Sequence, residues 1–130
     1  MTPQELKNRT KRFALDVLEL LESLPPSLTH RVVSGQLSRS APSTAANYRA
    51  ACRARSKAEF LSKLGIVEEE VDESLFWLEV LLEASPLDPR AKWHPRAEEL
   101  RKEADELLSI IVASRKTAGG SPDNPGVSSR

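Results

Sequence analysis

The chain has 130 residues, which is the length of one domain and enough to form a hydrophobic core. Its 19 lysines and arginines are balanced by 19 aspartates and glutamates, so the net charge of zero supplies no overall field that would attract nucleic acid or an anionic membrane. Leucine, alanine, glutamate and arginine dominate and glycine is scarce, which is typical of helical bundles.

The first predicted helix spans residues 3–24. Thr2 offers an N-cap, Pro3 suits the first helical position, and Glu5 completes a capping box with Thr2. Pro25 and Pro26 end the helix. Between these signals, apolar residues recur with helical spacing at Leu6, Phe13, Val17, Leu20, Leu21 and Leu24.

The second predicted helix spans residues 28–53 and contains Pro42. Proline lacks a backbone N–H and clashes with the preceding turn, so we expect a kink near Pro42. The helix should continue beyond it, because Ala45–Arg53 consists of good helix formers. Small and polar residues share a face, which would let a neighbouring helix approach closely. These residues are Gln36, Leu37, Ala41, Ala45, Asn47, Tyr48 and Ala51.

The third predicted helix spans residues 57–84. Ser56 and Glu59 form the pattern of a capping box, so the break between residues 54 and 56 is the clearest boundary in the sequence. Ser85 and Pro86 end the helix. Its predicted core stripe consists of Phe60, Leu61, Leu64, Val67, Val71, Leu75, Leu78 and Leu82.

A linker over residues 86–93, with a single turn expected after Asp88 and Pro89, precedes a fourth predicted helix at 94–117. Its inward residues are Ala97, Leu100, Ala104, Leu107, Leu108 and Ile111. Residues 118–130 have little to bury and are predicted to form a disordered tail. We therefore predict an all-α, up-down-up-down four-helix bundle over residues 1–117.

The third predicted helix is apolar almost all round between Leu75 and Leu82. One stripe fills the bundle core, and Ile66, Trp77 and Leu81 fall on a second face. The alternative is a loosely amphipathic helix with Trp77 half covered by its neighbours. We favour the second face as an interface for self-association.

Charge is unevenly distributed along the chain. Glu59 is the only acid between His30 and Lys63, whereas residues 64–83 carry seven acids and no base. If the second and third helices fold back on each other, Arg39 comes level with Glu69 and Glu70, which predicts an ion pair within one chain or between subunits. We therefore include Arg39 in the predicted interface.

The alternative is that basic residues between His30 and Lys63 form an exposed rim that binds phosphates. Its candidate residues for nucleic-acid binding are Arg49, Arg53, Arg55 and Lys57. The structural interpretation is that these cations are neutralised by the acids of the adjoining helix, and we favour it.

Residues typical of catalysis or metal binding do not form recognisable motifs. His30 and His94 are not part of Glu-x-x-His pairs. The carboxylates at positions 69, 72 and 73 share a face on which a hard cation could bind, although a solvated or ion-paired face is favoured. Cys52 has no second thiol and is interpreted as a small buried residue. We expect no catalytic residue, cofactor or metal.

Two further features bear on localisation. The sequence shows no signal peptide, and no apolar run approaches the roughly 20 residues that span a bilayer. We therefore expect a cytoplasmic protein with no membrane partner.

Several segments of the sequence match the pattern of one protein family. They are Thr10–Leu15, Gln36–Ala41, Ala46–Arg49, Arg55–Phe60, Lys63–Glu69, Asp72–Glu79 and Ala113–Ala118. Together they resemble a bacterial four-helix-bundle family first recognised as reading frames inside intervening sequences of 23S ribosomal RNA genes. Many members carry a proline where this chain has Ala45, and an Ala-Glu-Gly segment where it has Arg49–Ala51. Any role of that glutamate therefore does not transfer to this chain.

The resemblance implies an up-down bundle that assembles into a ring, a homopentamer, without an established enzymatic activity. A distant relative, the accessory protein of diversity-generating retroelements, is a basic pentamer that binds nucleic acid and a reverse transcriptase. The zero net charge of this chain weakens that parallel. We therefore favour a protein-interaction or scaffolding ring, and the alternative is a nucleic-acid-binding accessory factor.

Overall fold

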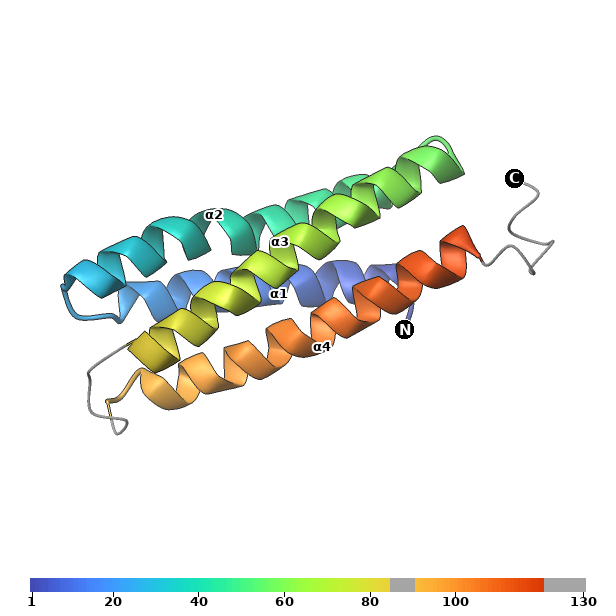
Figure 1. Cartoon of the computed structure of the whole chain (residues 1–130). Helices are drawn as coiled ribbons and strands as arrows, with labels where there is room; N and C mark the ends of the chain where they lie inside the picture. The colour runs from blue at the N-terminus through green and yellow to red at the C-terminus, as the bar shows by residue number, and fades with distance from the viewer. Residues whose placement is uncertain (85–90, 121–130) are drawn as a thin grey trace.

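Four helices form the regular secondary structure of the residues that the computed structural model describes, 1–84 and 91–120. They are α1 (Pro3–Glu22), α2 (Leu28–Ala51), α3 (Lys57–Ala84) and α4 (His94–Gly119). Successive helices run in opposite directions along one bundle (Figure 1). The all-α fold predicted from the sequence is confirmed, and the helix bounds lie close to the predicted ones.

Side-chain caps fix the starts of three helices. The Thr2 hydroxyl accepts a hydrogen bond from the Glu5 N–H at 3.0 Å, and the Glu5 carboxylate accepts one from the Thr2 N–H at 3.2 Å. At the starts of α2 and α3, the hydroxyls of Ser27 and Ser56 accept hydrogen bonds from the N–H groups three residues on, at 2.9 and 3.1 Å. These bonds satisfy N–H groups that have no partner inside the helix.

The helix α2 is unbroken from Leu28 to Ala51 with Pro42 inside it. Pro42 has no N–H to donate to the Ser38 carbonyl, one turn earlier. The surrounding residues nevertheless keep the helix continuous, as the run of good helix formers after Pro42 indicates. The kink near Pro42 stays a prediction.

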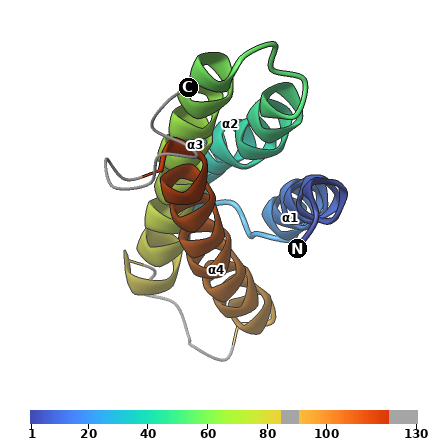
Figure 2. The same cartoon turned by 90° about the vertical axis from the view of Figure 1, so that its right-hand side faces the viewer.

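The core lies between all four helices, and the most extensive packing joins α2 to α3. Viewed from its right-hand side, the bundle has α1 and α3 on opposite sides (Figure 2). Helix α1 packs mainly against α2 and touches α4 less. The largest fully buried side chains include Phe13, Leu37, Leu64, Leu78, Leu81, Leu107 and Ile111.

The core stripe of α3 differs from the predicted one. Leu81 is completely buried, whereas Leu75 and Leu82 are only partly buried. Ser74 also lies in the core and donates a hydrogen bond to the Ser40 hydroxyl of α2 at 2.9 Å. Because the predicted stripe consisted of apolar residues only, it included Leu75 and Leu82 and did not include Ser74.

The predicted boundaries at the C-terminal side need one correction. Helix α4 includes residues 118 and 119, which were predicted to begin the tail. It ends at Gly120, whose φ of 69° lies in the left-handed region that glycine adopts easily. The remaining predicted tail, 121–130, and the predicted turn after Asp88 and Pro89 lie outside the described residues. Within the described ranges, no helix is long and apolar enough to cross a membrane.

Candidate interaction surfaces

The predicted ion pair of Arg39 forms within the chain. Its guanidinium contacts the carboxylates of Glu70, at 3.7 Å, and Glu73, so it joins α2 to α3. The sequence placed Arg39 level with Glu69 and Glu70, and the observed partners are Glu70 and Glu73. Because Arg39 is already engaged in its own subunit, it is less suited to a contact between subunits.

A buried polar cluster lies beside this ion pair. The Ser74 hydroxyl bonds to Ser40 and also to the Glu70 carbonyl, and the Thr44 hydroxyl donates to the Ser40 carbonyl at 2.9 Å. Ser40, Thr44 and Ser74 are fully buried. Their small side chains let α2 and α3 approach closely while every hydroxyl keeps a partner. This cluster therefore fixes the packing of α2 on α3 and leaves no polar group for a ligand.

Ion pairs also cross the contacts of α4 with α1 and with α3. Arg9 of α1 binds Glu103 and Glu106 of α4, each at 2.7 Å, and these hydrogen bonds raise the pKa of Arg9. Arg115 of α4 binds Glu68 of α3 at 2.9 Å. Sequence reasoning missed these pairs, because it does not give the rotation of each helix about its axis.

Both histidines contact aromatic or backbone groups of the bundle. His30 is buried, donates from Nδ1 to the Pro25 carbonyl at 2.6 Å, and meets the Trp93 ring edge-on at 5.5 Å. His94 follows Trp93 at the start of α4, with the two rings 5.7 Å apart. In the described part of the chain, no three potential ligands among His, Cys, Asp and Glu gather as a metal site would require.

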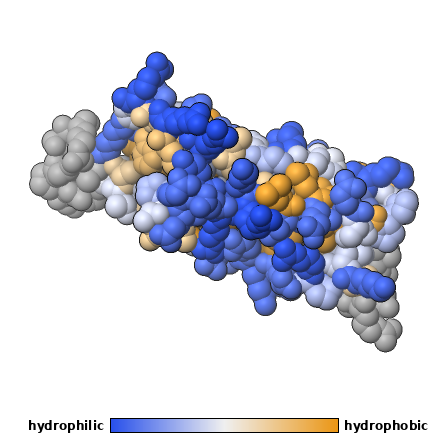
Figure 3. Space-filling model, turned by 180° about the vertical axis from the view of Figure 1, so that it is seen from behind, coloured by the Kyte–Doolittle hydropathy of each residue, from blue (hydrophilic) through white to orange (hydrophobic). Residues whose placement is uncertain are grey.

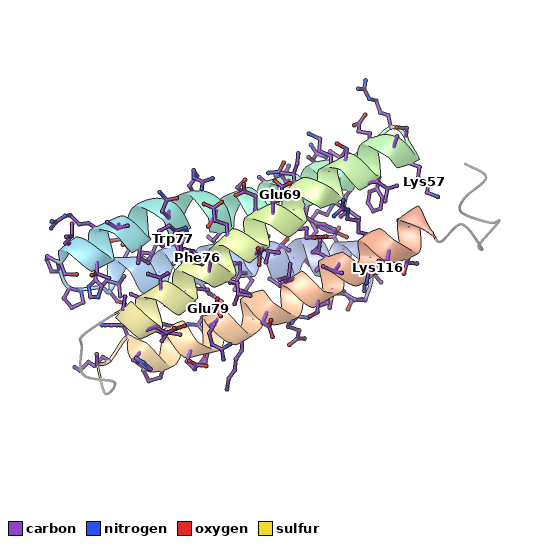
Figure 4. The ribbon with its side chains drawn as sticks, viewed as in Figure 1. Lys57, Glu69, Phe76, Trp77, Glu79 and Lys116 are labelled. Atoms are coloured by element: carbon purple, nitrogen blue, oxygen red, sulfur yellow. The ribbon has the colours of Figure 1, made fainter. Side chains whose placement is uncertain are left out.

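The outward side of α3 combines acids with the exposed Phe76 and the partly buried Val80. We define the acidic face of α3 as Glu69, Asp72, Phe76, Val80 and Glu83, which share one side of the helix by their spacing. Phe76 is 53% exposed, and its ring meets that of Trp77 edge-on at 5.0 Å. Figure 4 shows Glu69 and Phe76 along α3. Phe76 thus adds a large exposed apolar side chain between the carboxylates of this face.

The predicted interface residues of α3 separate into three groups. Ile66 is 37% exposed, and Trp77 is half-buried against the core. Leu81 is fully buried in its own bundle, so the prediction that it lies on a second face is wrong. Phe76, which sequence reasoning did not select, is the most exposed large apolar side chain of α3.

A groove between α1 and α2 carries the opposite charge. It has a volume of about 280 Å³ and is apolar along most of its length. Leu15 and Leu18 are 43% and 38% exposed on its α1 side. We define the basic groove by its lining residues, which are Lys7, Lys11, Ala14, Leu15, Leu18, Pro42, Ala45, Ala46 and Arg49.

The basic groove was not predicted, although the sequence contains a signal for it. Lys7, Lys11, Leu15 and Leu18 recur at spacings of three and four, so they share a face that the core stripe of α1 does not use. Seen from behind, the bundle shows hydrophobic surface between hydrophilic side chains (Figure 3). The groove therefore offers an apolar floor with a basic end.

The four residues predicted to bind phosphates lie in different surroundings. Arg49 lines the basic groove, and Arg53 is exposed after the end of α2. Arg55 is exposed and pairs with Glu59 at 3.5 Å, while Lys57 is partly buried at the start of α3. The structure thus brings Arg49 to two lysines of α1 that the sequence did not suggest.

A second hollow, of about 550 Å³, lies where the start of α1 meets the end of α4. Its lining includes Leu6, Phe60, Ile110 and the buried ring of Tyr48. Burial away from water raises the pKa of Tyr48, and the neighbouring Cys52 side chain raises it further. Cys52, interpreted from the sequence as a small buried residue, is partly buried against the core.

Because Tyr48 is the only tyrosine, its ionisation can be followed directly. We expect the native protein to form phenolate well above the ordinary pKa of about 10, and the urea-unfolded chain to form it near that value. The unfolded state then loses its proton first, so the free energy of unfolding falls as the pH rises above about 10. Near-ultraviolet absorbance during an alkaline titration measures both states. Identical titrations of the native and unfolded chain would contradict the burial of Tyr48.

The fold and surfaces define a four-helix-bundle protein with charged, partly apolar faces. The chain belongs to the family described as 23S rRNA-intervening sequence protein, which matches residues 4–113. The resemblance seen in the sequence is thereby confirmed.

A solved structure also resembles this chain. It is a protein with unknown function from the S23 ribosomal protein family from Bacteroides thetaiotaomicron. The two are 28% identical, with a TM-score of 0.76 over 89% of this chain and 99% of the other. No curated protein matches the chain.

Proposed function

We propose that this protein is a non-enzymatic subunit of a homo-oligomeric ring that acts as a protein-interaction scaffold in the bacterial cytoplasm. Five copies is the ring size that the resemblance to the family implies. The observation that carries the proposal is Phe76, a large apolar side chain that is 53% exposed on the outer side of α3. Water contact at such a surface is unfavourable, and a second protein chain would remove it.

The surroundings of Phe76 support this function. Ile66 and Val80 add apolar area on the same helix, and the ring of Trp77 meets that of Phe76 edge-on. Large aromatic residues with rigid support are typical centres of protein interfaces.

The proposal is tested by capture of tagged full-length protein from a native cell extract, with bound protein and nucleic acid both identified. We expect untagged copies of the chain and a defined protein partner to be recovered. A Phe76→Glu variant serves as the control that should lose the untagged copies. Recovery of neither copies nor partner by the wild type would contradict the scaffold function.

Nucleic-acid binding is the second candidate function. It is favoured by one observation: Lys7, Lys11 and Arg49 gather in one groove, and their side chains form no ion pair within residues 1–84 and 91–120. In a ring this basic surface would recur in every subunit, so weak sites would add by avidity.

We expect nucleic-acid binding to be at best micromolar, independent of sequence and lost near physiological salt. The neutral chain gives little electrostatic steering, and each neutralised phosphate releases counterions, which makes affinity fall steeply with salt. Fluorescence anisotropy with a short RNA and a short DNA across a salt series measures this. Tight binding at physiological salt that Lys7→Glu with Arg49→Glu in the basic groove abolishes would instead establish the nucleic-acid function.

A further inference from the structure

We propose that the basic groove between α1 and α2 of one subunit receives the acidic face of α3 from a second copy of the chain. This inference rests on the proposed self-association and adds the two surfaces that meet. Each surface is amphipathic, and their charges are opposite. The chain therefore carries both halves of a complementary contact.

The charges of the basic groove gather at one end. Lys7 and Lys11 precede Leu15 and Leu18 along α1. Since α2 runs antiparallel to α1, Arg49 near its C-terminal end lies at the same end of the groove as the two lysines. From the centre of the two lysines to the centre of the two leucines, α1 rises by about 11 Å.

The acidic face of α3 has the same layout. Glu69 and Asp72 precede Phe76 and Val80 along the helix, and both acids are exposed. No ion pair within the described residues engages Glu69 or Asp72. From the centre of the two acids to the centre of the two apolar residues, α3 also rises by about 11 Å. An α3 helix placed parallel to α1 would thus bring carboxylates to cations and Phe76 to the leucines.

The groove also suits a helix as its occupant. Its floor is made of small or compact residues, Ala14, Pro42 and Ala45, with Leu15 and Leu18 on one wall. Small residues allow the backbone of another helix to come close, and a helix laid in an apolar groove is a common mode of protein recognition. Phe76 would supply the large side chain that fills such a groove.

The positions of the two surfaces determine the symmetry of the contact. Helices α1 and α3 lie on opposite sides of the bundle (Figure 2). A contact between two different surfaces is heterologous, so each subunit still has one groove and one acidic face to offer after a single contact forms. Such contacts close into a ring when the rotation per subunit allows it, and they do not stop at a dimer.

Charge reversal tests the contact. We expect Lys11→Glu with Arg49→Glu to abolish self-association at micromolar concentration, and Glu69→Lys with Asp72→Lys to do the same. The chain that carries all four substitutions should assemble again, because its groove is acidic and its α3 face is basic. A matched control, Lys102→Glu with Lys116→Glu on α4, should keep the wild-type mass. Light scattering gives the mass, and circular dichroism confirms the helical content of each variant.

The outcomes separate this inference from the proposed function. If the wild type assembles and the groove variant keeps its mass, self-association stands and the groove is not its interface. If both double variants are monomeric and the fourfold variant does not assemble again, the two surfaces do not contact each other. That result would overturn the inference. A wild-type protein that is monomeric would contradict the proposed function itself.

Discussion

Leu37→Ala is expected to lower the free energy of unfolding by about 2–5 kcal/mol, because it removes a buried side chain and leaves a cavity. Leu37 is completely buried on α2, where it belongs to the core cluster shared by the helices. A domain of this size has a stability of about 5–15 kcal/mol, so the loss is a large part of the total. Urea unfolding followed by circular dichroism, at equal protein concentration, measures the change.

Leu28→Ala is the matched control for this change. It is the same substitution on the same helix, but Leu28 is 70% exposed. We expect the free energy of unfolding to change by roughly 0.5 kcal/mol or less. Equal losses in the two variants would mean that Leu37 does not lie in the core described above.

Phe76→Glu is expected to abolish self-association and leave the helical content unchanged. Phe76 is largely exposed in the single subunit, so its replacement costs the bundle little. In the assembly, the glutamate would be buried among apolar residues and beside the acids of its own face, which is strongly unfavourable. Sedimentation velocity measures the loss of the assembled species.

The control for this position is Phe76→Leu, which keeps an apolar side chain and should retain the assembly. The sequence also placed Trp77 on the predicted interface, so Trp77→Glu would be the corresponding change there. Because Trp77 packs against its own core, that variant would disturb the bundle as well, and Phe76 gives the cleaner result. An assembly of Phe76→Glu as strong as that of the wild type would place the interface elsewhere.

The fold was largely predictable from local signals. The capping residues Thr2 and Ser56 mark helix starts in the sequence and occupy the same positions in the structure. The inward residues of α4 were also predicted well, because its apolar residues follow a single helical stripe. These features depend on interactions within one turn, which a sequence displays directly.

The surfaces were predicted less well, for a physical reason. Helix α3 is apolar on several sides, so its sequence alone did not indicate that Leu81 would face the core and Phe76 the solvent. The choice depends on packing between helices, where Ser74 of α3 lies in the core and bonds to Ser40 of α2. The basic groove likewise requires the pairing of α1 with α2, since Lys11 and Arg49 come together only in the folded chain.

The central claim is that this chain assembles through contacts between its own copies, and the molar mass in solution tests it most directly. Light scattering of the full-length wild type at micromolar concentration should give a defined mass above that of a dimer, and five times the 14.4 kDa of one chain if the ring has the proposed size. A mass of 14.4 kDa that does not rise with concentration would contradict the account.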